Sequence, residues 1–144
     1  MRELPRQLTA EQLTPLFSGH TRLVEELAAR EDPLEVAAEV ALTLPEADQV
    51  AALAAHPRIG EPSEEQRGAE PEVLTELARL NAEYERKFGF EFVVFVQGRT
   101  RAELVPVLRE RLERTRAQEL ESGLLELCAI ARARWEQQGW TRST

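Results

Sequence analysis

The sequence predicts a single all-α domain over residues 1–144, with about seven or eight helices. Hydrophobic residues make up 42% of the chain but aromatic residues only 6%, so the core must rest on Leu, Ala and Val, which suits helices packed on helices. Apolar residues recur at helical spacing, and the segments that carry them start at capping residues and stop at proline or glycine. The length of 144 residues fits one domain.

Cap and proline signals divide the first part of the chain into four expected helices. Thr9 can cap the first, and Ser18 or Gly19 is expected to open the second. Asp32 followed by Pro33 is a strong start for the third, because a carboxylate cap precedes proline at the first helical position. The segments that these signals delimit are residues 10–17, 20–30, 34–44 and 46–55.

Similar signals bound the helices of the second half. Pro71 restarts a helix that Gly89 is placed to end in the left-handed region. Thr100 and Glu103 have the spacing of a capping box for the next helix, although Pro106 in its second turn should bend it or delay its start. The helices expected in this half cover residues 71–88 and 117–138, with the helix capped by Thr100 between them.

One stretch has the composition of a strand. It is "FEFVVFV", residues 90–96, which is rich in Phe and Val and is followed by Gly98. A single strand has no partner here, because no other stretch alternates convincingly. We therefore expect a buried extended segment or the start of a helix.

The charge balance restricts the class of partner. The formal net charge is -8 and the pI is about 4.9, which argues against nucleic acid as the main partner because such a protein needs a basic face. An anionic small substrate remains compatible, because the local field of a site can oppose the global sign. The N-terminal "MRELPRQLTAEQL" lacks the features of a signal peptide, and no apolar run approaches the roughly 20 residues that span a bilayer. We expect a cytoplasmic protein without a membrane partner.

The cysteine and histidine content does not favour a metal site. Cys128 is the single cysteine, so it can form neither an internal disulfide nor a cysteine-based metal site, and we expect it to be a small buried apolar group in a helix. His20 and His56 lie far apart, with no H-x-x-x-H or H-x-H pattern. His20 is expected to be a solvated or capping residue.

His56 is the sharpest catalytic candidate. It lies in "AAHPRIGEPSEEQ", where Pro57 must end the preceding helix and fix the histidine backbone. Histidine titrates near neutrality and can donate or accept a proton, but a helix-terminal histidine can also simply meet the last carbonyls. Glu64 and Glu65 follow in a first helical turn, where acids are favoured by the helix dipole, and only one of the two can face a site.

Two other features have both a structural and a functional interpretation. The segment 90–96 can be a hydrophobic plug, or its backbone N–H and C=O groups can bind a heterocyclic ligand. Arg132 and Arg134 can solvate the end of the last helix, or one of them can grip a carboxylate in bidentate fashion. The sequence does not decide which of the two arginines faces inward.

The order of these elements resembles a known family. "HPRIG", an "S-x-E-Q"-like element, "LNAEYERKFGFEFVV" and a late "IARAR" together resemble 2-oxo-4-hydroxy-4-carboxy-5-ureidoimidazoline (OHCU) decarboxylase, from urate degradation. The resemblance covers nearly the whole chain. It implies an all-α fold, usually a homodimer, with no metal or organic cofactor, that decarboxylates the ureidoimidazoline stereospecifically to (S)-allantoin.

The resemblance also assigns roles to residues. His56 corresponds to the catalytic histidine, acting as general acid/base, and Glu65 to the glutamate that orients the substrate. Substrate-binding positions fall on Pro57, Ser63, Gln66, Phe92, Val93, Val94, Phe95, Val96 and Arg134. We expect Arg134 to meet a substrate anion and the backbone of residues 92–96 to fix the polar edge of the ring.

The chain departs from the family pattern in places. Glu91 stands where the family usually has proline after "FGF", and the connection between the "HPRIG" and "EQ" elements is short, since Glu65 follows His56 by nine positions. The short connection motivates an alternative function: a non-catalytic helical module that binds a ligand or a partner on the same scaffold. A closed pocket between His56 and Glu65 would favour the enzyme, and an open groove would favour the module.

Overall fold

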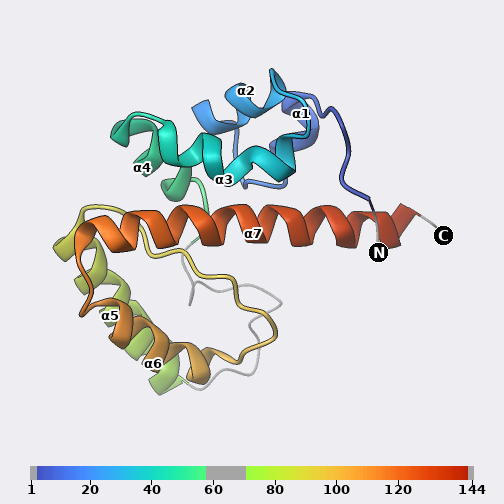
Figure 1. Cartoon of the computed structure of the whole chain (residues 1–144). Coiled ribbons are helices and arrows are strands. Elements are labelled where there is room, and N and C mark those ends of the chain that lie inside the picture. The colour runs from blue at the N-terminus through green and yellow to red at the C-terminus, as the bar shows by residue number, and fades with distance from the viewer. Residues whose placement is uncertain (1–2, 58–70, 143–144) are drawn as a thin grey trace.

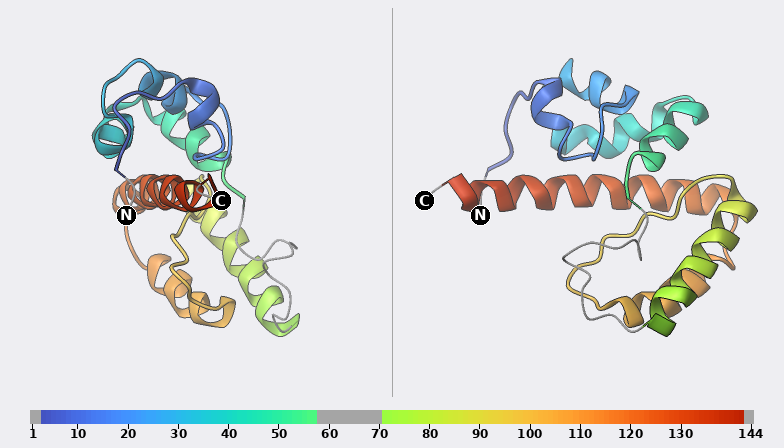
Figure 2. Two further views of the ribbon diagram at one scale, coloured as in Figure 1. Left: turned by 90° about the vertical axis from the view of Figure 1, so that its right-hand side faces the viewer. Right: turned by 180° about the vertical axis from the view of Figure 1, so that it is seen from behind.

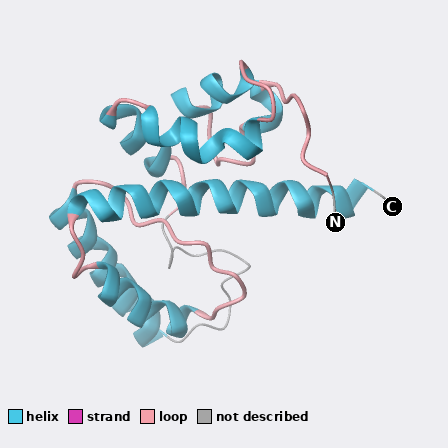
Figure 3. Ribbon diagram, in the orientation of Figure 1, coloured by secondary structure: helices cyan, strands magenta, loops and turns pink. Residues whose placement is uncertain are grey.

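The computed structural model describes residues 3–57 and 71–142. Within this range the chain forms seven helices and no strand, which confirms the expected all-α class (Figure 3). The helices are α1 (Ala10–Leu13), α2 (Arg22–Ala28), α3 (Pro33–Thr43), α4 (Glu46–Ala54), α5 (Pro71–Phe88), α6 (Arg101–Arg111) and α7 (Arg116–Arg142).

The long helix α7 runs through the middle of the molecule (Figure 1). Helices α1 to α4 cover one side of α7, and the α5–α6 hairpin extends from its N-terminal end on the other side (Figure 2). Helices α3 and α4 contact α7 directly, while α2 packs against α1, α3 and α4. Both ends of the chain lie near the C-terminal end of α7. Helix α7 therefore lies between helices α1 to α4 on one side and the α5–α6 hairpin on the other.

The N-terminal helices follow the predicted caps in part. Thr9 caps α1 through a capping box, in which its hydroxyl accepts from the Gln12 N–H at 3.1 Å and the Gln12 side chain accepts from the Thr9 N–H at 2.9 Å. The expectation that Ser18 or Gly19 opens α2 is wrong. Ser18 has φ +66°, outside the helical region, and the helix begins only after Thr21.

The Asp-Pro start of α3 is confirmed, but the expectation that the Asp32 carboxylate caps the helix is wrong. Pro33 occupies the first helical turn, where its missing N–H costs nothing. Asp32 has φ +53° and forms no side-chain cap hydrogen bond, so its carbonyl rather than its carboxylate starts the helix, accepting from the Glu35 N–H at 3.0 Å. Asp32 is also tied to the N-terminal segment, because its N–H donates to the Arg6 carbonyl at 2.8 Å.

Helix α5 and the segment after it match the predicted pattern. The helix buries Leu77, Leu80, Asn81, Tyr84 and Phe88 on one face, and Gly89 ends it with φ +83°. Residues 91–96 are extended but form no strand, and Phe92, Val93 and Val94 are buried there. The sequence left two interpretations of this segment open, and the structure selects the buried extended one. Its side chains complete an aromatic cluster around Tyr84, whose ring centroid lies 5.1 Å from that of Phe92.

Helix α6 begins where its capping box places it. The Thr100 hydroxyl accepts from the Glu103 N–H at 3.2 Å, and the Glu103 carboxylate accepts from the Thr100 N–H at 2.9 Å. Of the two effects expected of Pro106, a bend or a delayed start, the delayed start does not occur, because the helix already begins at Arg101. Pro106 has no N–H to donate to the carbonyl of Ala102, so the helix lacks one hydrogen bond there. Because Pro106 and Ala102 are both exposed, water can satisfy that carbonyl.

Helix α7 starts one residue earlier than predicted, at Arg116, and continues past residue 138 to Arg142. Its buried side chains include Leu124, Leu127 and Ala131. Gly123 allows a close crossing with α4, because a Cβ at this position would lie 3.2 Å from Leu53 Cδ2. No helix among the described residues has the length and apolarity required to span a membrane.

Candidate functional site

His56 lies just beyond the C-terminal end of α4. Its N–H donates to the Leu53 carbonyl at 3.1 Å, which closes a last turn before Pro57 leads the chain away from the helix. The His56 side chain is half-buried, whereas Pro57 is exposed. The helix therefore ends at the residue before Pro57, as the sequence indicated.

Arg134 approaches this histidine from α7. Its Nη1 donates to the carbonyls of Pro15 and Leu16 at 3.2 and 3.1 Å and to Ser18 Oγ at 2.7 Å. These three acceptors hold one arm of the guanidinium against the turn between α1 and α2. Arg132 is exposed and lines a different surface groove, of about 420 Å³, together with Cys128 and other residues. Arg134 is thus the arginine that lies with His56.

Ser18 joins these two residues. Its Oγ lies 3.3 Å from His56 Nδ1, within hydrogen-bond distance, in addition to the contact with Arg134. The neighbouring Gly19 lets the turn approach the end of α4 closely, because a Cβ there would lie 3.1 Å from Ala55 Cβ. Three parts of the chain far apart in sequence therefore meet at this point.

The electrostatics of the cluster favour a neutral imidazole. Burial, assisted by the positive charge of Arg134, lowers the pKa of His56 to about 4. At neutral pH the ring is uncharged, so it has one N–H donor and one acceptor nitrogen. The His56 imidazole can therefore exchange a proton with a substrate, although the ring is uncharged before the reaction begins.

Three side chains form hydrogen bonds with the backbone of residues 92–96. The Val93 carbonyl accepts from Arg111 Nη1 at 3.3 Å, and the Phe95 N–H donates to Glu126 Oε1 at 3.3 Å. The Phe95 carbonyl accepts from Arg99 Nη2 at 2.7 Å. Phe95 is partly buried and Val96 is exposed. Side chains here supply the hydrogen bonds that a partner strand would otherwise provide.

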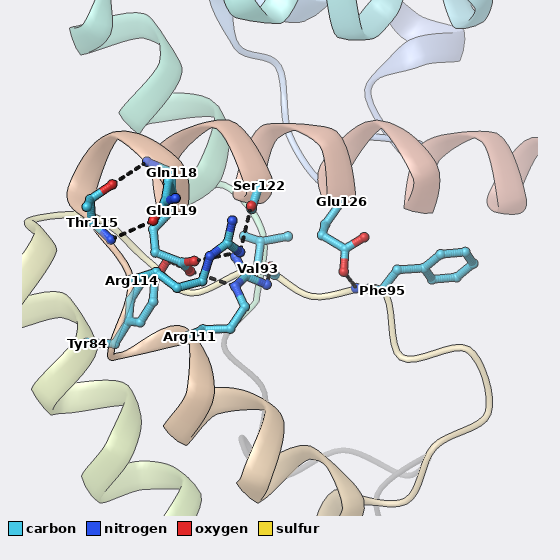
Figure 4. A network of polar contacts seen from close by, with 10 residues as sticks. All are labelled: Tyr84, Val93, Phe95, Arg111, Arg114, Thr115, Gln118, Glu119, Ser122 and Glu126. Carbon is cyan, nitrogen blue, oxygen red and sulfur yellow. Dashed lines mark hydrogen bonds and ion pairs between the residues drawn. The ribbon is translucent and has the colours of Figure 1, made fainter.

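A buried charge cluster behind this segment was not anticipated from the sequence (Figure 4). Glu119 is fully buried on α7, and its Oε1 accepts from Arg111 Nε at 2.6 Å and from the Tyr84 hydroxyl at 2.7 Å. Arg114 pairs with its other oxygen at 3.1 Å. The signal in the sequence is helical register, because Glu119 is in step with the core positions Gly123 and Leu127.

Other predicted site residues fall outside this geometry. Ser63, Glu64, Glu65 and Gln66 lie outside the described residues. His20 is exposed and lies 3.5 Å from the Glu25 carboxylate, in keeping with the expected solvated position. Cys128 is partly buried, and burial raises the pKa of its thiol to about 12, which makes it a poor nucleophile.

A larger groove, of about 700 Å³, lies along the α5–α6 hairpin. Its lining includes Arg79, Glu83 and Arg109, and neither His56 nor Arg134 lines it. The charged walls pair with one another, since Arg79 Nη1 lies 2.9 Å from Glu83 Oε1. We place the candidate site at His56 despite the size of this groove, because acid–base chemistry requires a titratable group in a partly buried setting.

Known proteins resemble this chain in sequence. It is 43% identical over 61 residues to the uric acid degradation bifunctional protein TTL of Arabidopsis thaliana, covering 42% of this chain and 19% of that protein. It is 34% identical over 91 residues to the uric acid degradation bifunctional protein PucL of Bacillus subtilis (strain 168), covering 55% and 18%. A bifunctional protein of the same description from Bacillus sp. (strain TB-90) is 31% identical over 111 residues, covering 69% and 22%. The matched part spans about a fifth of each of these relatives.

Solved structures resemble it in fold. A crystal structure of OHCU decarboxylase in the presence of (S)-allantoin superposes with a TM-score of 0.78 at 27% identity, covering 91% of this chain and 98% of that one. A crystal structure of (S)-allantoin synthase shares the fold with a TM-score of 0.68 at 21% identity, covering 87% and 47%. The family model described as OHCU decarboxylase matches residues 2–136. The chain therefore belongs to the OHCU decarboxylase family.

Proposed function

We propose that this protein is a cofactor-independent decarboxylase that converts OHCU to (S)-allantoin. The observation that carries the proposal is the meeting of His56 with Arg134 through Ser18. A partly buried, neutral imidazole beside a fixed cation suits a reaction in which an anionic substrate loses carbon dioxide and exchanges a proton. The family match supports the identity of the substrate.

The chemistry itself requires little beyond positioning. Loss of carbon dioxide breaks a carbon–carbon bond and leaves an electron pair on the substrate carbon. The conjugated imine and carbonyl groups of OHCU can accept that pair, so the substrate supplies its own electron sink. The protein has to hold the carboxylate out of the ring plane, exclude water and deliver a proton to one face only.

Named residues provide these functions. His56 acts as the general acid/base on one face of the ring, a contribution typically of about 10²–10⁴ in rate. The guanidinium of Arg134, anchored through Nη1, attracts a substrate anion. Glu65 orients the ureido or ring N–H groups, and Pro57, Ser63 and Gln66 bind the substrate. These last assignments rest on the family resemblance.

The segment 92–96 forms the remaining wall. Hydrogen bonds with Arg111, Glu126 and Arg99 restrain its backbone. A restrained backbone edge can hold the polar side of a heterocycle without the entropy cost of ordering a loop. We propose that backbone groups of this segment contact the substrate ring.

We further propose that the protein works as a cytoplasmic homodimer, as the family resemblance implies. Light scattering coupled to gel filtration tests the assembly: a mass of two chains supports it, and a mass of one chain over the working concentration range rejects it.

Decarboxylation of freshly generated OHCU, followed by circular dichroism of the allantoin formed, tests the function. Wild type should accelerate the reaction and give the S enantiomer. His56→Ala should lose about 10²–10⁴ in rate, while His20→Ala, which removes the exposed histidine, should match wild type. If wild type and His56→Ala give the same slow racemic product, the proposal is wrong.

The short connection between His56 and Glu65 keeps the non-catalytic module as the competing function. Isothermal titration calorimetry with (S)-allantoin, combined with the turnover assay, distinguishes the decarboxylase from the non-catalytic module. Binding without turnover by wild type supports the module, whereas turnover that depends on His56 rejects it.

A further inference from the structure

We infer that Ser18 is a positioning residue for His56: its hydroxyl, polarised by Arg134, donates to Nδ1 and holds the imidazole as the tautomer with its hydrogen on Nε2. The catalytic consequence of this inference rests on the proposed function, but the tautomer itself does not. Ser18 belongs to the turn between α1 and α2, and neither the sequence motifs nor the family resemblance above assigned it a role in the site.

The direction of the first hydrogen bond is fixed by chemistry. A guanidinium has donors only, so Ser18 Oγ must accept from Arg134 Nη1 at 2.7 Å. A hydroxyl that accepts from a cation becomes a stronger donor and a weaker acceptor, because hydrogen bonds in a chain polarise one another. The hydroxyl hydrogen is then directed to the remaining neighbour, His56 Nδ1 at 3.3 Å.

The state of the ring completes the assignment. The charge of Arg134 and the burial of the imidazole both disfavour the imidazolium form, so the resting ring carries a single hydrogen. When Nδ1 accepts a hydrogen bond, that hydrogen must lie on Nε2. A substrate therefore meets an N–H donor at the ring nitrogen that Ser18 leaves available.

The backbone of Ser18 supports a functional reason for a hydroxyl at this position. Its φ of +66° lies in the left-handed region, where glycine fits without strain and other residues are uncommon. A strained non-glycine residue at a candidate site points to a role for its side chain. Here that side chain is the one bridging Arg134 and His56.

The tautomer matters for the proposed reaction. As carbon dioxide leaves, negative charge develops on the oxygens conjugated with the substrate carbon. A neutral imidazole that donates a hydrogen bond from Nε2 can stabilise this charge. The opposite tautomer would present a lone pair to those oxygens and oppose the charge.

Nitrogen NMR tests the tautomer directly in the substrate-free protein. The chain has only two histidines, so a His20→Gln background leaves the signals of His56 alone. At neutral pH we expect a pyridine-type shift at Nδ1 and a pyrrole-type shift at Nε2. Ser18→Gly, which removes the hydroxyl and suits the positive φ, should move both shifts toward the average of a mixed tautomer population. A pyrrole-type Nδ1, or shifts that Ser18→Gly leaves unchanged, overturns the inference.

Kinetics test the consequence. Ser18→Gly should lower kcat about 10–100-fold, the range seen when a metal-bound histidine loses the partner that orients it, with KM changed much less. Thr14→Ala removes a hydroxyl from the same turn whose hydrogen bond goes to the Ala10 carbonyl, and it should leave kcat unchanged. Thermal unfolding of both variants shows whether the fold survives.

The outcomes separate the two claims. If the wild type is inactive but shows the expected nitrogen shifts, the proposed function is wrong and the tautomer assignment stands. An active Ser18→Gly with wild-type kcat rejects a positioning role whatever the tautomer. Equal losses of kcat in Ser18→Gly and Thr14→Ala, with lowered melting temperatures, mean that Ser18 is only structural.

Discussion

Arg111 Nε donates to Glu119 Oε1 across 2.6 Å, and this pair joins α6 to α7 with both side chains buried. Arg111 also reaches the Val93 carbonyl at 3.3 Å and lies over the Phe92 ring, 4.7 Å from its centroid. One guanidinium thus connects the α5–α6 hairpin and the extended segment to the central helix. The position of residues 92–96 therefore depends on a charge that Glu119 neutralises.

Glu119→Gln should lower the free energy of unfolding by roughly 3 kcal/mol or more, because it leaves the buried charge of Arg111 uncompensated. Urea unfolding followed by circular dichroism measures this loss. Glu121→Gln is the matched control, since Glu121 is exposed on the same helix and should change stability by less than about 0.5 kcal/mol. Equal effects of the two substitutions would mean that the pair contributes nothing specific.

Tyr84 should resist ionisation until the protein unfolds. Burial, together with its hydrogen bond to Glu119, raises the pKa of this phenol well above its usual range. A raised folded-state pKa adds stability that is complete below the unfolded pKa of about 10 and is lost as pH rises beyond it. Tyr84 is the only tyrosine, so phenolate absorbance reports on it alone.

The measurement is an alkaline titration with absorbance and circular dichroism recorded together, with Tyr84→Phe as the absorbance blank. We expect phenolate absorbance and loss of helix to appear at the same pH. Ionisation near pH 10 in a still-folded protein would show that the hydroxyl is open to solvent.

Local signals in the sequence predicted most helix ends correctly. Thr9, Thr100 and Gly89 act within a few residues of their own positions, so their roles can be inferred without knowledge of the fold. Ser18 was misjudged because the opposite holds there: serine is a common cap, but this turn lies against Ala55, which is far away in sequence, where a Cβ on Gly19 would come within 3.1 Å of Ala55 Cβ.

The sequence pointed to two residues of the candidate site, but not to the contacts that support them. His56 and Arg134 were singled out by residue type and family resemblance. The link between them through Ser18 could not be predicted, because it depends on the turn after α1 lying against α7, which no local sequence pattern encodes. Glu119 carried a weaker signal, a charge in register with buried positions, which indicates a buried partner but does not identify it.

The depressed pKa of His56 should make stability depend on pH in a specific window. The folded pKa is about 4 and the unfolded value about 6.5, so between these values the unfolded chain binds a proton that the folded chain does not. Stability should therefore fall as pH drops from about 6.5 to 4, by an amount on the order of 2–3 kcal/mol.

His56→Gln provides the comparison, because it removes this titration and keeps a polar side chain. Urea unfolding at several pH values should give a difference between wild type and variant that shrinks or reverses as pH falls through the window. A constant difference across it would place the pKa of His56 near its ordinary value. Arg134→Gln should move that pKa upward, since it removes the neighbouring positive charge.

Gly19→Ala should push the turn between α1 and α2 away from the C-terminal end of α4. The new Cβ would lie 3.1 Å from Ala55 Cβ, so one backbone must shift, and we expect a loss of about 1 kcal/mol or more in the free energy of unfolding. The shift also draws Ser18 away from His56, because Ser18 immediately precedes Gly19. Ala55→Gly supplies the missing space, so the double variant should be more stable than the sum of the single losses predicts. Strict additivity in this double-mutant cycle would show that the close packing of the two residues does not hold the turn in place.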